Sequence, residues 1–342
     1  MANILRSLLH RLGAALIVMI GISMLIFAIA RVMPGDPARI ALGPNATAEQ
    51  VAALRLERHL DASLPVQYFE FVKSLAKGDL GTSLYTNRPV TTDIAQFLPA
   101  TLELVLVSGI LMVLIGLPLG ILSAHFRGRF PDHVGRLIAL LGVCTPAFVW
   151  GVILQLVLGY FWGAFPIEGQ LAQSTVAPPL VTGFMLIDTL LAGDGAAFLD
   201  ALHHLIPPSL ALAMSGLGQT ARLTRSNMNE VYERPYVEMA RAYGFPARRI
   251  ATRYAFRPAL IPTLTILGLE FAAMLGNAFL VEKVFGWPGL SRYGVEVILR
   301  KDLDAIVGTV LIIAAAFLIV NIIVDILVNV INPRIRLAAG RA

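Results

Sequence analysis

The sequence predicts an all-α integral membrane protein with six transmembrane helices and a small extracytoplasmic helical subdomain after the first one. Of the 342 residues, 57% are hydrophobic and 14% are charged, whereas a soluble chain averages about 25% charged residues. Six apolar stretches reach or approach the roughly 20 residues that cross a bilayer, and basic residues gather on alternate loops between them. These observations exclude an ordinary globular enzyme, a disordered chain and a fibrous protein.

The six expected spans differ in how cleanly they are apolar. They cover residues 12–30, 104–124, 137–167, 205–221, 259–281 and 305–324. The first three hold no charged side chain, and the third is long enough for a span with an apolar extension. The fourth is the weakest because it opens with Pro207 and Pro208, Glu270 interrupts the fifth, and Asp325 follows the sixth. A cleaved signal peptide is the alternative for the first stretch, whose 19 uncharged residues exceed the usual ~7–15.

Two segments are expected outside the membrane. Residues 170–187 are uncharged, but their polar side chains and the adjacent Pro178 and Pro179 favour an outer loop over a seventh span. Residues 32–99 are long enough for a small, mostly helical subdomain. In it Val51 and Leu54 belong to an apolar pattern that continues to Leu60, and Thr47 can cap the helix.

The placement of charge predicts the topology. With both termini in the cytoplasm, the inner segments hold 16 basic and 4 acidic residues, and the outer segments hold 11 basic and 15 acidic ones. Residues 163–204 contain no lysine or arginine, whereas 222–257 contain eight arginines. Because cytoplasmic loops concentrate basic residues, orientation alone explains the net charge of +5, and nucleic-acid binding is not needed to account for it.

These features divide the chain into four parts. Residues 1–31 form an N-terminal cytoplasmic tail and the first span, and 32–99 form the extracytoplasmic subdomain. Residues 100–332 form a transmembrane core that includes the inner loop 222–258, and 333–342 form a cytoplasmic tail.

The inner loop contains a short helix with a clear beginning and end. Its sequence over residues 234–246 is RPYVEMARAYGFP. Proline favours the first helical turn, and glycine favours the position just past the last turn. We therefore expect a helix from Pro235 to Tyr243, with Glu238 and Arg241 placed as the helix dipole prefers. On spacing alone, an interfacial linker helix explains the pattern equally well.

The loop also resembles a known signature. Glu238, Ala240 and Gly244 match the EAA motif in the inner loop of ABC importer permeases, and RLTRSNM at 222–228 resembles the inner loop of the dipeptide and oligopeptide permeases. Further motifs fit the same family, most closely its DppB-like subunits: PGDP at 34–37, GDLG at 78–81, LVTGFMLID at 180–188, FGWPGL at 285–290 and NPRIR at 332–336. The resemblance thus extends from end to end.

This resemblance implies a type I ABC importer permease fold in the bacterial inner membrane. It implies three kinds of partner: a second homologous permease, two P-loop ATPases, and an extracytoplasmic substrate-binding protein that delivers a dipeptide, a short peptide or a related solute. The implied ATPase-coupling residues are Pro235, Glu238, Met239, Ala240, Tyr243, Gly244 and Phe245. The chain departs from the signature at Met239, where the family has alanine, and at 256–258, where Phe-Arg-Pro replaces a Leu-Pro pair.

The resemblance also assigns residues on the outer side. It implies that Asp36, Asp79 and Trp287, which lie in the outer motifs, contact the binding protein.

The chain itself is not expected to be an enzyme. It contains no Gly-Lys dipeptide and therefore no P-loop, so ATP and Mg²⁺ would be bound by the partner ATPases and this chain would hold no cofactor. The six histidines are dispersed over different loops and the single cysteine, Cys144, lies in an apolar run, which predicts no metal site.

Ionisable residues within spans are functional candidates by default. Glu103, at the outer end of the second span, and Asp325, at the inner end of the sixth, have structural explanations as an interfacial residue and an anchor. Glu270, with Asn277 nearby, can either line a polar translocation path or bond to a neighbouring helix. An ion-coupled secondary transporter that uses Glu270 is the alternative function. Gly116 and Gly120 favour close helix packing.

Overall fold

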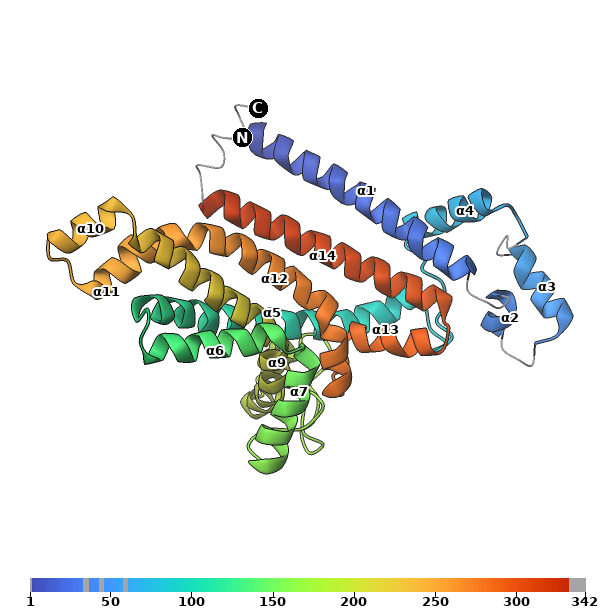
Figure 1. Cartoon of the computed structure of the whole chain (residues 1–342). Coiled ribbons are helices and arrows are strands. Elements are labelled where there is room, and N and C mark those ends of the chain that lie inside the picture. The colour runs from blue at the N-terminus through green and yellow to red at the C-terminus, as the bar shows by residue number, and fades with distance from the viewer. Residues whose placement is uncertain (1, 33–36, 43–45, 58–60, 332–342) are drawn as a thin grey trace. The chain divides into compact units, whose positions relative to one another are not determined.

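The computed structural model of the chain is helical throughout the residues it describes, which are 2–32, 37–42, 46–57 and 61–331 (Figure 1). Within them Thr82 and Pro89 form one isolated β-bridge. The helices, with π-helical segments labelled η, are α1 Ala2–Val32, α2 Pro37–Leu42, α3 Ala48–Glu57, α4 Leu64–Ala76, α5 Val90–His125, α6 Phe130–Cys144, α7 Ala147–Leu154, η1 Gln155–Phe161, α8 Met185–Leu191, α9 Gly195–Tyr232, α10 Pro235–Ala242, α11 Ala247–Arg249, η2 Ile250–Ala255, α12 Phe256–Val284, α13 Leu290–Leu299 and α14 Leu303–Ile331.

The chain folds as two compact units. The first consists of Met1–Pro99 and Pro288–Leu318, and the second of Ala100–Trp287 and Ile319–Ala342. Helices α5 and α14 therefore contribute residues to both units.

Several helices have the length and apolarity of membrane spans. Among the described residues, Val90–His125, Ala247–Val284 and Leu303–Val324 meet both conditions. The pair α6 and α7 with η1 meets them jointly but bends by 111° between its two parts. Each of the six stretches expected from the sequence begins on a helix of the structure. The fold is thus all-helical with several membrane-length helices, while the count of six spans stays a prediction.

The third expected span changes direction at the bend between α6 and α7. Thr145 has extended backbone angles, φ −101° and ψ 125°, because the ring of Pro146 disfavours the helical region for the residue before it. Pro146 then begins α7. The uncharged run 137–167 is therefore not one straight helix. The segment that follows it, 170–187, is not helical until α8 begins at Met185.

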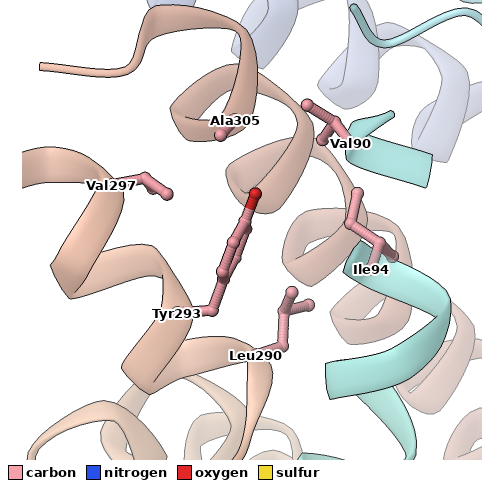
Figure 2. Close-up of a cluster of buried hydrophobic side chains, with 6 residues drawn as sticks. All are labelled: Val90, Ile94, Leu290, Tyr293, Val297 and Ala305. Carbon is pink, nitrogen blue, oxygen red and sulfur yellow. The ribbon is translucent and has the colours of Figure 1, made fainter. Parts of the chain in front are cut away.

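The first unit has a core built from α5, α13 and α14. Tyr293 is stacked on Phe97 with 5.1 Å between ring centroids, and its hydroxyl donates a hydrogen bond to Asp93 at 3.0 Å. Figure 2 shows the buried side chains that converge here: Val90, Ile94, Leu290, Tyr293, Val297 and Ala305.

Two fully buried carboxylates fix the turn before α5. Asp302 accepts hydrogen bonds from Ser83 Oγ at 2.7 Å and from the Leu84 amide at 2.6 Å. Asp93 accepts one from Arg88 Nη2 at 2.6 Å. Both aspartates are 0% exposed, so these bonds are needed to offset the loss of hydration of two charges.

The predicted cap of the helix after Thr47 is confirmed. The Gln50 amide donates to Thr47 Oγ1 at 3.3 Å, and the Thr47 amide donates to Gln50 Oε1 at 3.0 Å. This reciprocal pair is a capping box, and it begins α3 at Ala48.

Helix α9 is the centre of the second unit, where it contacts α6, α7, α8 and α12. Glycines permit close approach at its crossings. A Cβ atom at Gly120 of α5 would lie 2.7 Å from the carbonyl oxygen of Ala221, and one at Gly142 of α6 would lie 2.5 Å from that of Met214. A Cβ atom at Gly116 would likewise lie 3.1 Å from the Leu217 carbonyl oxygen, so the close packing predicted for Gly116 and Gly120 is confirmed.

Replacing Gly120→Ala should destabilise the second unit, because the added methyl group would overlap backbone that cannot move without shifting α9. Such overpacking costs about 1–3 kcal/mol, and thermal unfolding of the purified chain in detergent measures it. Gly276→Ala is the control, since nothing lies within 4 Å of a Cβ at that position. Equal melting temperatures for the two variants would contradict the close approach.

Candidate functional site

The predicted short helix is present as α10, from Pro235 to Ala242. Pro235 occupies the first turn after Arg234, which has extended angles of φ −81° and ψ 141°. Tyr243, expected as the last helical residue, is instead the C-terminal cap. The helix is shorter than the ~12–15 residues at which isolated helices become even marginally stable in water, so its ends and its packing must hold it.

Gly244 ends α10 in a Schellman motif. The Phe245 amide donates to the Ala240 carbonyl at 3.2 Å, and the Gly244 amide donates to the Arg241 carbonyl at 2.9 Å. These two bonds satisfy carbonyls that the end of a helix leaves without partners. The motif requires a left-handed residue, and Gly244 has φ +75°, which glycine adopts without the steric cost that a Cβ imposes.

One face of α10 is buried against the rest of the loop. Val237 and Ala240 are 0% and 4% exposed and form a cluster with Ile250 of η2. Phe245 packs beside this cluster and lies 5.5 Å from the ring of Tyr254. The small residue of the signature, Ala240, is therefore an internal packing residue.

The other face of α10 is exposed and apolar at its centre. Tyr236, Met239 and Tyr243 are 44%, 60% and 76% exposed, and their spacing of three and four residues places them on one side of the helix. Glu238 is also exposed, and its carboxylate has no hydrogen-bond or ion-pair partner within the described part of the chain. Figure 1 shows α10 and α11 beyond the ends of α9 and α12.

The base of the loop is tied to the loop between α5 and α6. Arg225 of α9 donates to both carboxylate oxygens of Asp132, at 2.6 and 2.9 Å, and the Gly128 amide adds a bond of 2.9 Å. Asp132 is 1% exposed. The bidentate bond from Arg225 lowers the pKa of Asp132 to about 2, so the carboxylate is ionised at physiological pH. Sequence reasoning missed this pair, because 93 residues separate its members.

Tyr232, the last residue of α9, lies beneath α10. Burial raises the pKa of its phenol, and the guanidinium of Arg241 lies 5.8 Å from the centre of its ring. The cation and the aromatic face attract each other, which adds a contact between α10 and the end of α9.

The two candidate path residues lie on α12 without a shared cavity. Glu270 and Asn277 are seven residues apart in the sequence. This spacing places them about 10 Å apart along the helix axis and on nearly the same face of α12. Asn277 lines a cavity of about 260 Å³ together with Thr145, Pro146 and Ser215. Glu270 is half-buried against α9, near Gly216, and within the described chain its carboxylate has no hydrogen-bond or ion-pair partner.

Other carboxylates near the ends of the spans are bonded within the unit. Glu103 is 4% exposed and accepts bonds from the amides of Met185 and Leu186, at 3.1 and 2.8 Å, at the beginning of α8. The role of Glu103 is thus structural, but as a buried acceptor for the first amides of α8 and not as the interfacial residue that was expected. Glu282, which the sequence did not single out, is 0% exposed and accepts a bond of 2.6 Å from Thr101 Oγ1. The side chain of Asp325 lies outside what the structure describes.

The three expected binding-protein contacts differ in accessibility. Asp36 lies outside the described residues. Asp79 is exposed and accepts a bond of 2.9 Å from the Gly81 amide. Trp287 is 1% exposed, and its indole N–H donates to the Ala100 carbonyl at 3.0 Å, so its ring is packed inside the second unit.

Comparisons with known proteins cover nearly the whole chain. Residues 116–337 match the family described as "Binding-protein-dependent transport system inner membrane component", and residues 4–105 match "Binding-prot-dependent transport system membrane comp, N-term". The chain is 42% identical over 332 residues to the probable D,D-dipeptide transport system permease protein DdpB of Escherichia coli K12, covering 97% of each chain. It is 37% identical to the dipeptide permease DppB of the same strain and 35% identical to the glutathione permease GsiC of Salmonella choleraesuis, covering 97% of this chain and 99% of each relative.

The Asp132–Arg225 pair should stabilise the chain in a pH-dependent way. Because the native pKa of Asp132 is about 2 and an unfolded aspartate titrates near ~3.9, the stabilisation is complete above about pH 5 and is lost as the pH falls towards 2. Asp132→Asn should therefore lower the stability at pH 7 by about 1–3 kcal/mol. Thermal unfolding in detergent should show a constant deficit between about pH 5 and 8 and a shrinking one below about pH 4.

The control for this variant is Asp61→Asn, which removes an exposed carboxylate 3.9 Å from Arg55. Such a surface pair contributes little. A deficit in Asp132→Asn that is unchanged at about pH 3 would show that the charge of Asp132 is not what stabilises the loop.

Proposed function

Because the chain belongs to the family of inner membrane components of binding-protein-dependent transport systems, we propose that α10 is the helix through which partner ATPases drive it. The chain is a permease subunit of a binding-protein-dependent ABC importer, and it is not itself catalytic. ATP and Mg²⁺ would be bound by two P-loop ATPase subunits. A second, homologous permease would complete the translocation path, and an extracytoplasmic binding protein would deliver the cargo.

This proposal rests on the difference between the two faces of α10, one buried against its own loop and the other exposed. Val237 and Ala240 bind the helix to its own loop, while Tyr236, Met239 and Tyr243 present apolar surface to the outside. Exposed apolar and aromatic side chains beside a polar rim are typical of protein docking surfaces. We propose that this surface inserts into a groove of the ATPase, with Glu238 at its edge and Pro235, Gly244 and Phe245 holding its shape.

In the proposed mechanism, α10 transmits the movement of the ATPase subunits to the membrane spans as a rigid element. When ATP closes the two ATPase subunits, each would move the α10 of its permease. The contacts of α10 with α9 and η2, and of Arg225 with Asp132, would then carry that movement into the spans. A ligand shifts a conformational equilibrium only through differential binding to the two states, and here ATP would supply that difference through its own subunits.

We propose a topology of six spans with both termini in the cytoplasm of a bacterial cell. The apolar stretches and the basic residues of the 222–258 loop support it. Residues 32–99 would then lie outside, as a helical subdomain of α2, α3 and α4. Asp79 would contact the binding protein directly, as would Asp36, whereas Trp287, buried within the second unit, would act on any such contact only indirectly.

The cargo proposed is a dipeptide or another short peptide. The named relatives are permeases for D,D-dipeptides, dipeptides and glutathione. All of these solutes are small amide-containing acids, so the proposed path must accept a carboxylate. Asn277 and Glu270 are the proposed polar residues of the path.

Gly244→Asp should abolish peptide uptake while leaving membrane insertion intact. A residue with a Cβ pays about 1–2 kcal/mol for the left-handed conformation, and a carboxylate at the end of α10 opposes the helix dipole. No atom lies within 4 Å of the new Cβ, so the loss would not come from a clash within the chain. Uptake of a radiolabelled dipeptide into cells measures it.

The matched control is Gly244→Asn, which has the same shape without the charge and should retain more uptake. Co-purification of the ATPases should fall in the same order. Normal uptake by Gly244→Asp would refute the assignment of α10 as the coupling helix.

Glu270→Gln should change the rate of uptake without abolishing it, because ATP rather than a proton gradient drives the movement. Uptake into proteoliposomes, with ATP supplied and the proton gradient collapsed, measures this. Complete loss of uptake in the variant, together with dependence of the wild type on the gradient, would instead favour ion coupling through Glu270.

A further inference from the structure

A basic cavity lies along α6, between this helix and the C-terminal parts of α5 and α9. Its volume is about 530 Å³, and it is lined by Ser123, His133, Gly135, Arg136, Leu137, Ala139, Leu140, Val143, Cys144, Ala221, Arg222 and Arg225. Every lining residue belongs to the second unit. The lining thus combines three arginines with an apolar wall.

The positive charge of this cavity is not neutralised from within. Arg225 forms a bidentate ion pair with Asp132, so the charges of these two residues compensate each other. Arg222 bonds to the neutral Gln219 at 2.7 Å. Arg136 is attracted by Asp132, which Arg225 already pairs, but it has no hydrogen-bond or ion-pair partner of its own in the described part of the chain, and none of the lining residues is acidic. Two guanidinium charges are therefore available to an anion.

The basic cavity adjoins the cavity that contains Asn277. Val143 and Cys144 line both. The second cavity is neutral and polar, since Thr145, Ser215 and Asn277 line it and no charged residue does. The bend at Thr145 and Pro146 lies at their junction. The neutral polar cavity and the basic cavity therefore lie next to each other.

We propose that the basic cavity is an exit site that receives the carboxylate of the cargo, with Arg136 and Arg222 as its binding residues. This inference rests on the proposed function, in which short peptides pass α12 and leave on the side of the basic loops. Guanidinium groups bind carboxylates with charge-assisted hydrogen bonds, and the apolar wall of Leu137, Leu140 and Val143 suits the side chains of a peptide. Partial exposure of both arginines would keep the binding weak enough for release.

The single cysteine of the chain permits a direct test, because Cys144 lines the cavity and is exposed. The assembled importer, free of nucleotide, is placed in nanodiscs of phosphatidylcholine. Cys144 is then reacted with a methanethiosulfonate reagent that carries either a sulfonate or a trimethylammonium group. The same importer with Cys144→Ser subtracts the reaction of partner cysteines. Relative to a small free thiol, the sulfonate reagent should react about three- to tenfold faster than the cationic one.

Two further measurements identify the ligand. Alanyl-alanine should slow the labelling of Cys144, and alanyl-alanine amide, which lacks the carboxylate, should not. Arg136→Gln with Arg222→Gln should remove both the reagent preference and the protection, and should lower dipeptide uptake about three- to tenfold. Arg127→Gln with Arg129→Gln, an equal loss of two charges on the loop between α5 and α6 and outside the cavity lining, should change none of these.

Each contrary result overturns the proposal. No labelling by either reagent would mean that the cavity is closed to solvent, and equal protection by the peptide and its amide would exclude carboxylate recognition. Protection by phosphatidylglycerol in the nanodisc but not by alanyl-alanine would identify a lipid phosphate as the anion instead. Arg136→Lys with Arg222→Lys must retain the preference, which separates lost charge from misfolding. Failure of the wild-type importer to take up peptide would instead count against the proposed function, since the labelling needs no transport.

Discussion

The second unit depends on the distance at which α9 crosses α5 and α6. Between helices in a bilayer there is no hydrophobic driving force, so close van der Waals packing must stabilise the contact. Gly120 and Gly142 allow the backbone carbonyls of α9 to take the space that side chains would otherwise fill. Because α9 continues without interruption to Tyr232, the same helix that is held at these crossings also sets the position of α10. A displacement at its end is therefore opposed by backbone contacts, which cannot yield as flexible side chains do.

The short helix α10 must also be held in a fixed position, but its end motifs and one packed face hold it there. It is too short to be stable by itself, so Pro235 begins it, the Schellman motif at Gly244 ends it, and the cluster of Val237, Ala240 and Ile250 holds it against η2. With its inner face used in this way, only the opposite face remains for a partner. The signature residues consequently separate by role, with Ala240 and Gly244 shaping the helix and Glu238 and Met239 facing outward.

Local chemistry was predictable from the sequence, and long-range contacts were not. Proline and glycine predicted α10 to within one residue, and Thr47 predicted the cap of α3, because both signals act within four residues of their effect. The 111° bend was not predicted, since an uncharged run reports apolarity and not direction. The burial of Trp287 under Ala100 and the pairing of Asp132 with Arg225 depend on residues far apart in the chain, which no local pattern encodes. Membership of the permease family, inferred from motifs, was confirmed by comparison along the whole chain.

The carboxylates of the second unit separate into two groups by what they bind. Glu103, Asp132 and Glu282 are each at least 96% buried and hydrogen-bonded to a neighbouring segment, which is how a structural charge offsets its desolvation. Glu270 is half-buried and has no hydrogen-bond or ion-pair partner in the described chain. A carboxylate at membrane depth that makes no hydrogen bond or ion pair destabilises the fold. Contact with water or cargo therefore explains the presence of Glu270 better than folding does. Arg136 is exposed and is attracted by Asp132, but it has no hydrogen-bond or ion-pair partner in the described chain. The two side chains are of opposite charge, and a zwitterionic peptide has a complement for each of them.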